Sequence, residues 1–177
     1  MSYLTYESLS ANSQRYDSRR IINENNSVIY AKHKMIKVFL SHKHDEPISL
    51  INQVRGFFLS LNAELYIDWL DKDMPNVVGP VTANHLKNTI NAMSKFIVLA
   101  TPKSIESIWI PWELGLADQA KGLDHIAILP ILHSGDDWRQ REYYRIYSEI
   151  RNENGKWLVM PQGDTGTSTE LLNWLQR

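Results

Sequence analysis

The chain contains no cysteine among its 177 residues. This absence excludes a disulfide framework, a thiolate zinc site and a cysteine nucleophile. An excess of charge of one sign is also missing, because 19 lysines and arginines stand against 20 aspartates and glutamates and leave a formal net charge of −1. The sequence therefore carries no electrostatic footprint for nucleic acid or for an anionic membrane surface, and we expect neither as a partner.

Long hydrophobic runs are absent too. No stretch approaches the roughly 20 apolar residues that a membrane-spanning helix needs, and the N-terminus lacks the apolar run of a signal peptide. Together with the lack of cysteine, this predicts a soluble, cytoplasmic protein. The length and the hydrophobic content of 43% suffice for one domain with a real core.

The first 34 residues differ from the rest in composition. They are rich in serine, asparagine, tyrosine and arginine and hold only short apolar clusters. We therefore expect an N-terminal extension over residues 1–34, partly helical at best, that packs on the domain or on a neighbour. The sequence assigns this extension no role, and the domain itself is expected over residues 35–177.

From Met35 onward, short β-rich runs alternate with helical patterns. This alternation predicts an α/β fold, namely a doubly wound, five-stranded parallel sheet with helices on both faces. The helices are expected over residues 47–61, 80–92, around Trp109, over 138–150 and over 168–176, the last capped by Ser168 or Thr169. The strands are expected over residues 36–41, 64–68, 95–100, 125–130 and 157–161.

A glutamate interrupts the apolar face of the helix that begins near Trp109. Glu113 follows Trp109 by one turn and falls among apolar residues at intervals of three and four, namely Trp109, Trp112, Leu116, Ala117 and Ala120. A carboxylate on such a face loses solvation. It must therefore be paired with another group, be protonated, or serve a function such as catalysis. The alternative is a first-turn glutamate that the helix dipole favours and whose tip reaches water.

The position of Glu113 in the predicted sheet favours a functional role. Polar residues follow the first predicted strand at 41–45 and the second at 68–73, and Glu113 follows the third. Ligands of open parallel sheets bind beyond the carboxyl ends of the strands, near the topological switch point. Polar groups from three strands are therefore expected to meet at one edge, with Glu113 as the one acidic residue on an apolar face.

Three blocks, in this order, resemble a TIR (Toll/interleukin-1 receptor) domain of the bacterial type. Residues 38–42 with Asp45 resemble the first-strand box, although His42 stands where many members carry tyrosine or phenylalanine. Residues 66–68 with a loop ending at Gly79-Pro80 resemble the second strand and the BB loop. The pattern Ser107-x-Trp109-x-x-x-Glu113 resembles the box that holds the catalytic glutamate of members that cleave NAD+, with Pro111 as a departure.

The resemblance implies a flavodoxin-like TIR fold and cleavage of the bond between nicotinamide and ribose in NAD+, which is a substrate and not a cofactor; no other cofactor is implied. This cleavage passes through an oxocarbenium-like transition state that a carboxylate can stabilise, and Glu113 takes this catalytic role. Lys43 would be available to a phosphate, Asp68 and Trp69 would hold ribose and adenine, and Trp109 would form a wall. The predicted substrate-binding residues are Ser41, His42, Lys43, Asp68, Trp69 and Trp109.

For four of these residues a structural role competes. Trp109 fits plain core packing nearly as well. Ser41, His42 and Lys43 fit a loop that enters a helix, and for Lys43 this structural role is favoured. His42, His44 and Asp45 look like metal ligands, but a fourth ligand at a suitable spacing is lacking, so a loop is favoured and no metal is expected.

The predicted function is an NAD+ nucleosidase that gives nicotinamide and either ADP-ribose or a cyclic isomer, in bacterial immune signalling or antiviral defence. The resemblance also implies self-association through TIR–TIR contacts and a separate downstream effector. Two other classes stay open. One is a non-catalytic TIR adaptor, and the other is an N-glycosidase similar to the nucleoside deoxyribosyltransferases.

Overall fold

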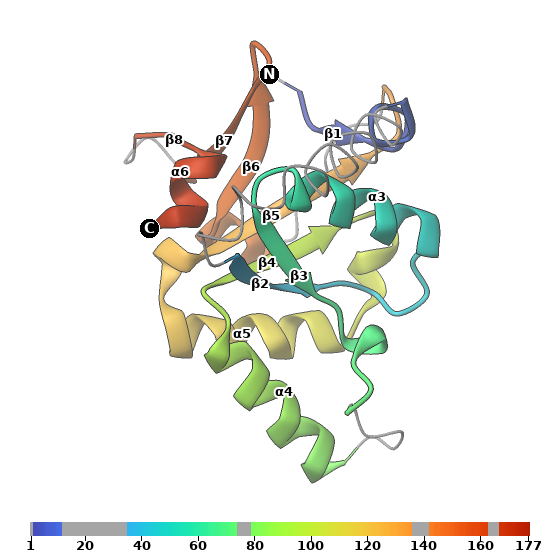
Figure 1. Cartoon of the computed structure of the whole chain (residues 1–177), viewed down its shortest axis with the longest axis vertical. Helices are drawn as coiled ribbons and strands as arrows, with labels where there is room; N and C mark the ends of the chain where they lie inside the picture. Colours follow the sequence, from blue (N-terminus) through green and yellow to red (C-terminus); the bar gives the residue numbers. More distant parts are fainter. Residues whose placement is uncertain (1, 12–34, 74–78, 136–141, 163–166) are drawn as a thin grey trace, which may run out of the picture.

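The computed structural model describes residues 2–11, 35–73, 79–135, 142–162 and 167–177. Their strands form one sheet in the order β3-β2-β4-β5-β6-β7-β8, with β1 paired to β5 (Figure 1). The strands are β1 (Leu4–Thr5), β2 (Ile36–Ser41), β3 (Ala63–Tyr66), β4 (Lys95–Ala100), β5 (Ile126–Leu132), β6 (Ser148–Glu153), β7 (Lys156–Met160) and β8 (Thr169–Glu170). The α-helices beside the sheet are α3 (Ile48–Leu59), α4 (Pro80–Ala92), α5 (Trp109–Lys121) and α6 (Leu171–Gln176).

The centre of the sheet is parallel and doubly wound. Strands β3, β2, β4, β5 and β6 pair in parallel, and the chain passes from β3 at one edge across β2 to β4. The topological switch point therefore lies between β2 and β4, as in flavodoxin-like sheets. This confirms the predicted α/β fold with a mostly parallel sheet and helices on its faces.

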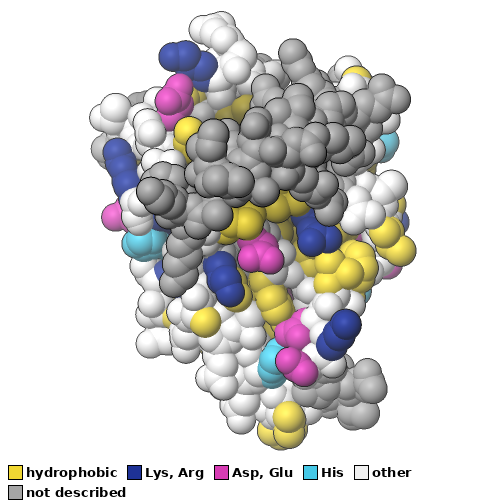
Figure 2. All heavy atoms as spheres, in the orientation of Figure 1, with side chains coloured by type: hydrophobic (Ala, Val, Ile, Leu, Met, Phe, Trp, Pro, Cys, Tyr) yellow, Lys and Arg dark blue, Asp and Glu magenta, His cyan; other side chains and the backbone are white. Residues whose placement is uncertain are grey.

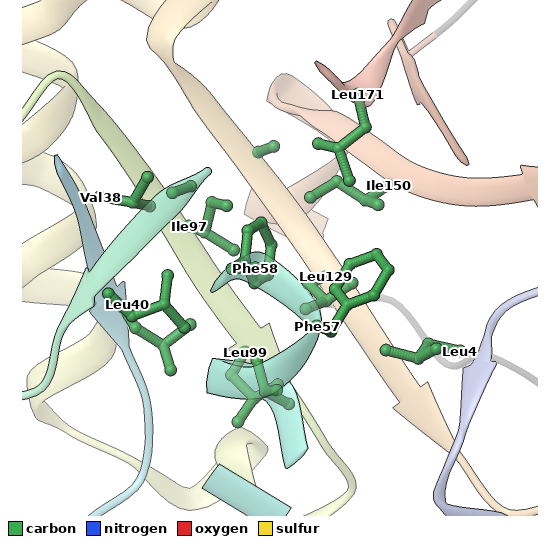
Figure 3. Packing of buried hydrophobic residues seen from close by; sticks show 14 of the residues in the cluster. Leu4, Val38, Leu40, Phe57, Phe58, Ile97, Leu99, Leu129, Ile150 and Leu171 are labelled. Atoms are coloured by element: carbon green, nitrogen blue, oxygen red, sulfur yellow. The ribbon is translucent and has the colours of Figure 1, made fainter. Parts of the chain in front are cut away.

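Two hydrophobic cores cover the two faces of the sheet. Helix α3 packs on one face, and its residues Phe57 and Phe58 belong to the same hydrophobic cluster as Leu99 of β4 and Leu129 of β5 (Figure 3). Helices α4 and α5 pack on the other face through residues such as Ile90 and Leu114 (Figure 1). Strand β4 is buried throughout because its side chains alternate between these two cores.

The far end of the sheet corrects the prediction. Instead of a helix over 138–150, the chain forms a 3₁₀ turn at Glu142–Ile146 and then β6, while residues 138–141 lie outside the described residues. Strand β7 pairs with β6 in antiparallel orientation, so the fifth predicted strand is not parallel. The cause is the turn Asn154-Gly155, whose φ angles of 52° and 83° close a tight hairpin and leave no room for a crossover.

The last helix is shorter than predicted. Residues Thr169–Glu170 form β8 against β7, and α6 begins only at Leu171. Its first turn has no side-chain cap, so neither Ser168 nor Thr169 plays the predicted capping role. The hydrogen bonds of a sheet edge have replaced the expected first turn of the helix.

The first residues of the chain pack on the sheet. Strand β1 continues the sheet beside the end of β5, with Leu4 opposite Ile131, and Leu4 and Leu9 are buried in the core of α3. Part of the predicted extension therefore contacts the domain. Residues 12–34 lie outside the described residues, and the boundary at residue 34 stays a prediction.

The described surface agrees with the balanced composition. Figure 2 shows acidic, basic and hydrophobic side chains intermixed on one face, without a region of a single sign. A cavity of about 370 Å³ opens at the edge strand β3 between Arg55, Leu65 and Lys72, and Glu113 is not among its lining residues. None of the helices in the described ranges is long and apolar enough to cross a membrane.

Candidate active site

Helix α5 presents Glu113 on its buried face. The buried residues of this helix are Ile110, Glu113, Leu114 and Ala117, so the glutamate is one of the residues of the face that packs on the sheet. The buried face of α5 differs from the predicted apolar stripe, because Trp109, Trp112 and Leu116 are only half-buried and Ala120 is exposed.

The start of α5 sets the spacing of the motif. The Ser107 hydroxyl oxygen accepts hydrogen bonds from the backbone N–H groups of Trp109 (3.3 Å) and Ile110 (3.2 Å). Pro111 lies in the first turn, where the helix needs no donor from it, so this residue costs no hydrogen bond. Both residues therefore fit the beginning of a helix that places Glu113 one turn further on.

Ser41 holds the Glu113 carboxyl group. Ser41 is the last residue of β2, and its Oγ donates a hydrogen bond of 2.5 Å to Glu113 Oε2 in a buried environment. Burial raises the pKa of Glu113 to about 7, against the opposing effects of the Ser41 hydrogen bond and of His44, while Asp68 adds to the increase. A carboxyl group with this pKa exchanges its proton near neutral pH, as functional carboxyl groups often do.

Asp68 organises the second part of the site. It follows β3, is buried, and its Oδ2 lies 2.8 Å from His44 Nε2. Its Oδ1 accepts the backbone N–H of Trp69 at 2.8 Å. Burial alone would raise the pKa of Asp68, but the hydrogen bond from His44 and the nearby His42 hold this pKa below its ordinary value. Asp68 is therefore an ionised carboxylate close to a carboxyl group that is only partly ionised.

His42 is a buried, neutral side chain with a fixed tautomer. Trp69 Nε1 donates to His42 Nε2 at 3.0 Å, and His42 Nδ1 lies 3.2 Å from the carbonyl oxygen of Leu40. Because Nε2 accepts, the ring proton must be on Nδ1 and is donated to Leu40. Burial lowers the pKa of His42, against the effect of Asp68. His42 thus links the end of β2 to the segment after β3.

The remaining predicted residues lie at the border of the site. Trp109 packs edge-to-face on Trp112, with ring centroids 5.5 Å apart, and borders the core of α5. Lys43 pairs with Glu106 at 2.8 Å and with Asp45 at 3.5 Å. The contacts thus form two groups, Ser41 with Glu113 and His42 with Trp69 and Asp68, and place Lys43 in a separate ion pair. Which of them binds a ligand stays a prediction.

The burial of two further carboxyl groups, those of Glu46 and Glu149, was not predicted from the sequence. Glu46 is 6% exposed, its Oε1 accepts a hydrogen bond from the Thr101 hydroxyl, and its Oε2 has no hydrogen-bond partner among the described residues. Burial raises the pKa of Glu46. Burial of a carboxyl group is therefore not limited to the apolar face of α5. Glu46 stands in a polar stretch before Pro47, where the sequence offers no signal of burial.

His44 was considered only as a metal ligand, but it is the ion-pair partner of Asp68. The pair lies within the predicted meeting of residues 41–45 with residues 68–73, but the sequence does not single out these two members. Within the described ranges, no group of three or more His, Cys, Asp or Glu side chains is arranged to hold a metal ion.

Replacing Ser41 by alanine is expected to raise the pKa of Glu113 by about one unit, because the lost hydrogen bond favours the ionised form. The carboxyl carbon of Glu113, followed by NMR across a pH titration, measures this shift. Ser60→Ala is the matched control, since the Ser60 hydroxyl donates to Phe57 far from the site. An unchanged pKa in the Ser41 variant would contradict the proposed contact.

Comparison with known proteins identifies a relative of similar sequence. A scan against models of protein families finds no match. The chain is 30% identical over 125 residues to the probable 3′ cyclic ADP-D-ribose synthase ThsB′ of Bacillus cereus (strain MSX-D12). The match covers 68% of this chain and 63% of that protein, so the chain spans less than two thirds of the length of this relative.

Three findings now agree on the family. The sheet has a flavodoxin-like strand order, the residues of the three motif blocks meet at the carboxyl ends of β2, β3 and β4, and a curated relative shares 30% identity. The chain therefore belongs to the TIR domains of the bacterial type.

Proposed function

We propose that this domain cleaves the nicotinamide–ribose bond of NAD+ and releases nicotinamide. The observation that carries the proposal is the buried carboxyl group of Glu113, held by Ser41 at the carboxyl edge of the sheet, with a pKa raised to about 7. NAD+ is the substrate of the proposed reaction, which needs no further cofactor.

The chemistry matches a site with one reacting carboxylate. When the bond between C1′ of the ribose and the ring nitrogen breaks, its electron pair stays with nicotinamide, and positive charge develops on the ribose. Nicotinamide leaves as a neutral base, so the site needs no strong general acid. Ionised Glu113 would stabilise the developing charge or accept a hydrogen bond from a ribose hydroxyl, and its burial strengthens this interaction.

The relative supports a cyclic product. It is named as a synthase of a cyclic ADP-ribose, and we carry this product to the present chain as part of the proposal. In cyclisation, a nucleophile on the adenosine half of the same molecule attacks C1′, whereas in hydrolysis water does so. Trp69, of which 38% is exposed beside the site, would help to exclude water and would favour cyclisation over hydrolysis.

Self-association is part of the same proposal. Ile108 is 83% exposed directly before α5, and Ile105 and Ile48 are also exposed. Apolar side chains next to a site are suited to contacts with another TIR domain. We place the protein in bacterial immune signalling, where a separate effector would read the product.

The test is nicotinamide release from NAD+ at high protein concentration, with the products separated by chromatography. We expect nicotinamide together with a cyclic ADP-ribose isomer or ADP-ribose, and the second product decides between cyclisation and hydrolysis. A non-catalytic adaptor would release nothing under the same conditions, also when the protein is crowded. Release of bases from nucleosides, but not from NAD+, would instead indicate an N-glycosidase of another class.

A further inference from the structure

A site for NAD+ must accept a diphosphate with two negative charges, and its own carboxylates oppose this. Asp68 is ionised, and Glu113 is ionised in part. Lys43 does not compensate them, because two carboxylates, those of Glu106 and Asp45, already surround its ammonium group. A cation that is not already paired with two carboxylates would favour a diphosphate beside Glu113.

His44 has the position and the charge for this role. Its Nε2 lies 2.8 Å from Asp68 Oδ2, and the hydrogen bond to Asp68 raises the pKa of His44 in spite of partial burial. It is close enough to Glu113 for each charge to affect the pKa of the other group. Its side chain is 63% exposed, and among the described residues its Nδ1 has no hydrogen-bond partner.

We propose that His44 binds the diphosphate of NAD+, with Nε2–H held by Asp68 and Nδ1–H donated to a phosphate oxygen. This inference rests on the proposed function and adds a substrate-binding residue to it. His44 would act in binding and not in bond cleavage, and it would favour dinucleotides over substrates that lack a diphosphate.

The surroundings of His44 support a fixed, charged ring. Asp68 orients the imidazole through one nitrogen, so less conformational entropy is lost when the other nitrogen binds a ligand. The ring of His42 lies 6.1 Å away, and His42 is neutral, so it does not repel the imidazolium. Asp68 would thus hold His44 while His42 and Trp69 hold the segment that carries Asp68.

Lys103 is the rival cation. Its Nζ donates to the backbone oxygen of Asp45 at 3.4 Å, and its charge acts on Glu46 and Glu106 rather than on Glu113. His44, in contrast, acts on Glu113 itself. Of these two cations, only His44 has a charge that acts on the carboxyl group of Glu113, so His44 is the better candidate for the diphosphate.

The experiment compares His44→Gln with wild type on two substrates. Glutamine keeps a donor for Asp68 but carries no charge. We expect KM for NAD+ to rise about tenfold with kcat changed less than about threefold, because a charge-assisted hydrogen bond to the diphosphate is lost. For nicotinamide riboside, which contains the same scissile bond but no diphosphate, KM should stay unchanged. His133→Gln is the matched control, since His133 has the same 63% exposure and pairs with Glu7.

Several results would overturn the inference. They are an equal rise of KM for both substrates, a fall in kcat with KM unchanged, or a rise of KM for NAD+ in Lys103→Gln that His44→Gln does not show. Calorimetry with ADP-ribose separates this inference from the proposed function, since ADP-ribose carries the diphosphate and is not cleaved. About tenfold weaker binding of ADP-ribose by His44→Gln supports the inference even if wild type releases no nicotinamide, and equal or absent binding overturns it.

Discussion

Replacing Glu113 by glutamine is expected to reduce nicotinamide release from NAD+ by about 10²- to 10³-fold, the usual effect of removing a group that stabilises charge in a transition state. Glutamine has nearly the size of glutamate, and its side-chain oxygen can still accept the hydrogen bond from Ser41. The packing of α5 is therefore kept, while the negative charge near the ribose is lost. Initial rates of nicotinamide release at saturating NAD+ measure the effect.

Glu46→Gln is the matched control for this variant. Glu46 and Glu113 are 6% and 5% exposed, each follows a strand of the parallel sheet, and each accepts a hydrogen bond from a hydroxyl group. We expect Glu46→Gln to keep its rate within about tenfold of wild type, since Glu46 contacts Thr101 and not the residues around Glu113. Normal release by Glu113→Gln, or an equal loss in both variants, would contradict the assignment of Glu113.

The central elements could be predicted from the sequence because local signals and tertiary structure agree there. The predicted ranges 36–41, 80–92 and 95–100 coincide with β2, α4 and β4. Pro80 fixes the first turn of α4, and β4 is an uninterrupted apolar run, which suits a strand covered on both faces.

In the C-terminal part, two signals in the sequence predict different structures. The helical periodicity over 138–150 suggested a helix, yet Ser148–Glu153 forms β6. The dipeptide Asn154-Gly155 is a strong signal for a two-residue hairpin. This signal alone predicts that the last long strand is antiparallel, as the structure shows. Pairing in the sheet overrode the local periodicity.

The sequence predicts site residues that belong to a motif at a strand end. It does not predict residues whose burial depends on contacts with distant parts of the chain. Glu113 and Ser41 are 72 residues apart, but both follow strands that a doubly wound sheet brings to one edge. Glu46 is buried by Thr101, 55 residues further along, and a polar sequence around Glu46 gives no sign of this. The tryptophans of α5 were assigned to the buried stripe because of their spacing in the sequence, but they are half-buried and lie at the border of the buried face.

Glu113→Gln is also expected to be more stable than wild type at alkaline pH. A glutamate in the unfolded chain has the ordinary pKa of 4.5, whereas burial raises the pKa of folded Glu113 to about 7. Between these values the folded state holds a proton that the unfolded state has lost. The free energy of unfolding of wild type therefore falls as the pH rises from about 4.5 to about 7, by up to about 3 kcal/mol from this residue.

Glutamine does not ionise, so the variant lacks this loss of stability. Urea unfolding at pH 5 and at pH 8.5 measures the free energy of unfolding of both proteins, and the contributions of all other ionisable groups cancel in the difference. We expect the variant to gain on wild type by up to about 3 kcal/mol between the two pH values. Glu64→Gln, on the exposed side of the edge strand β3, is the control and should show no such gain.

The two expected results for Glu113→Gln bear on the role of this residue together. If Glu113 served only the fold, glutamine would keep its packing and the hydrogen bond from Ser41, and nicotinamide release would be unchanged. A variant that is inactive and yet more stable at pH 8.5 would show that the ionised carboxylate is maintained at the expense of the fold, as at other functional sites. A difference in the free energy of unfolding that is the same at both pH values would contradict the raised pKa and, with it, the electrostatic basis of the proposed function.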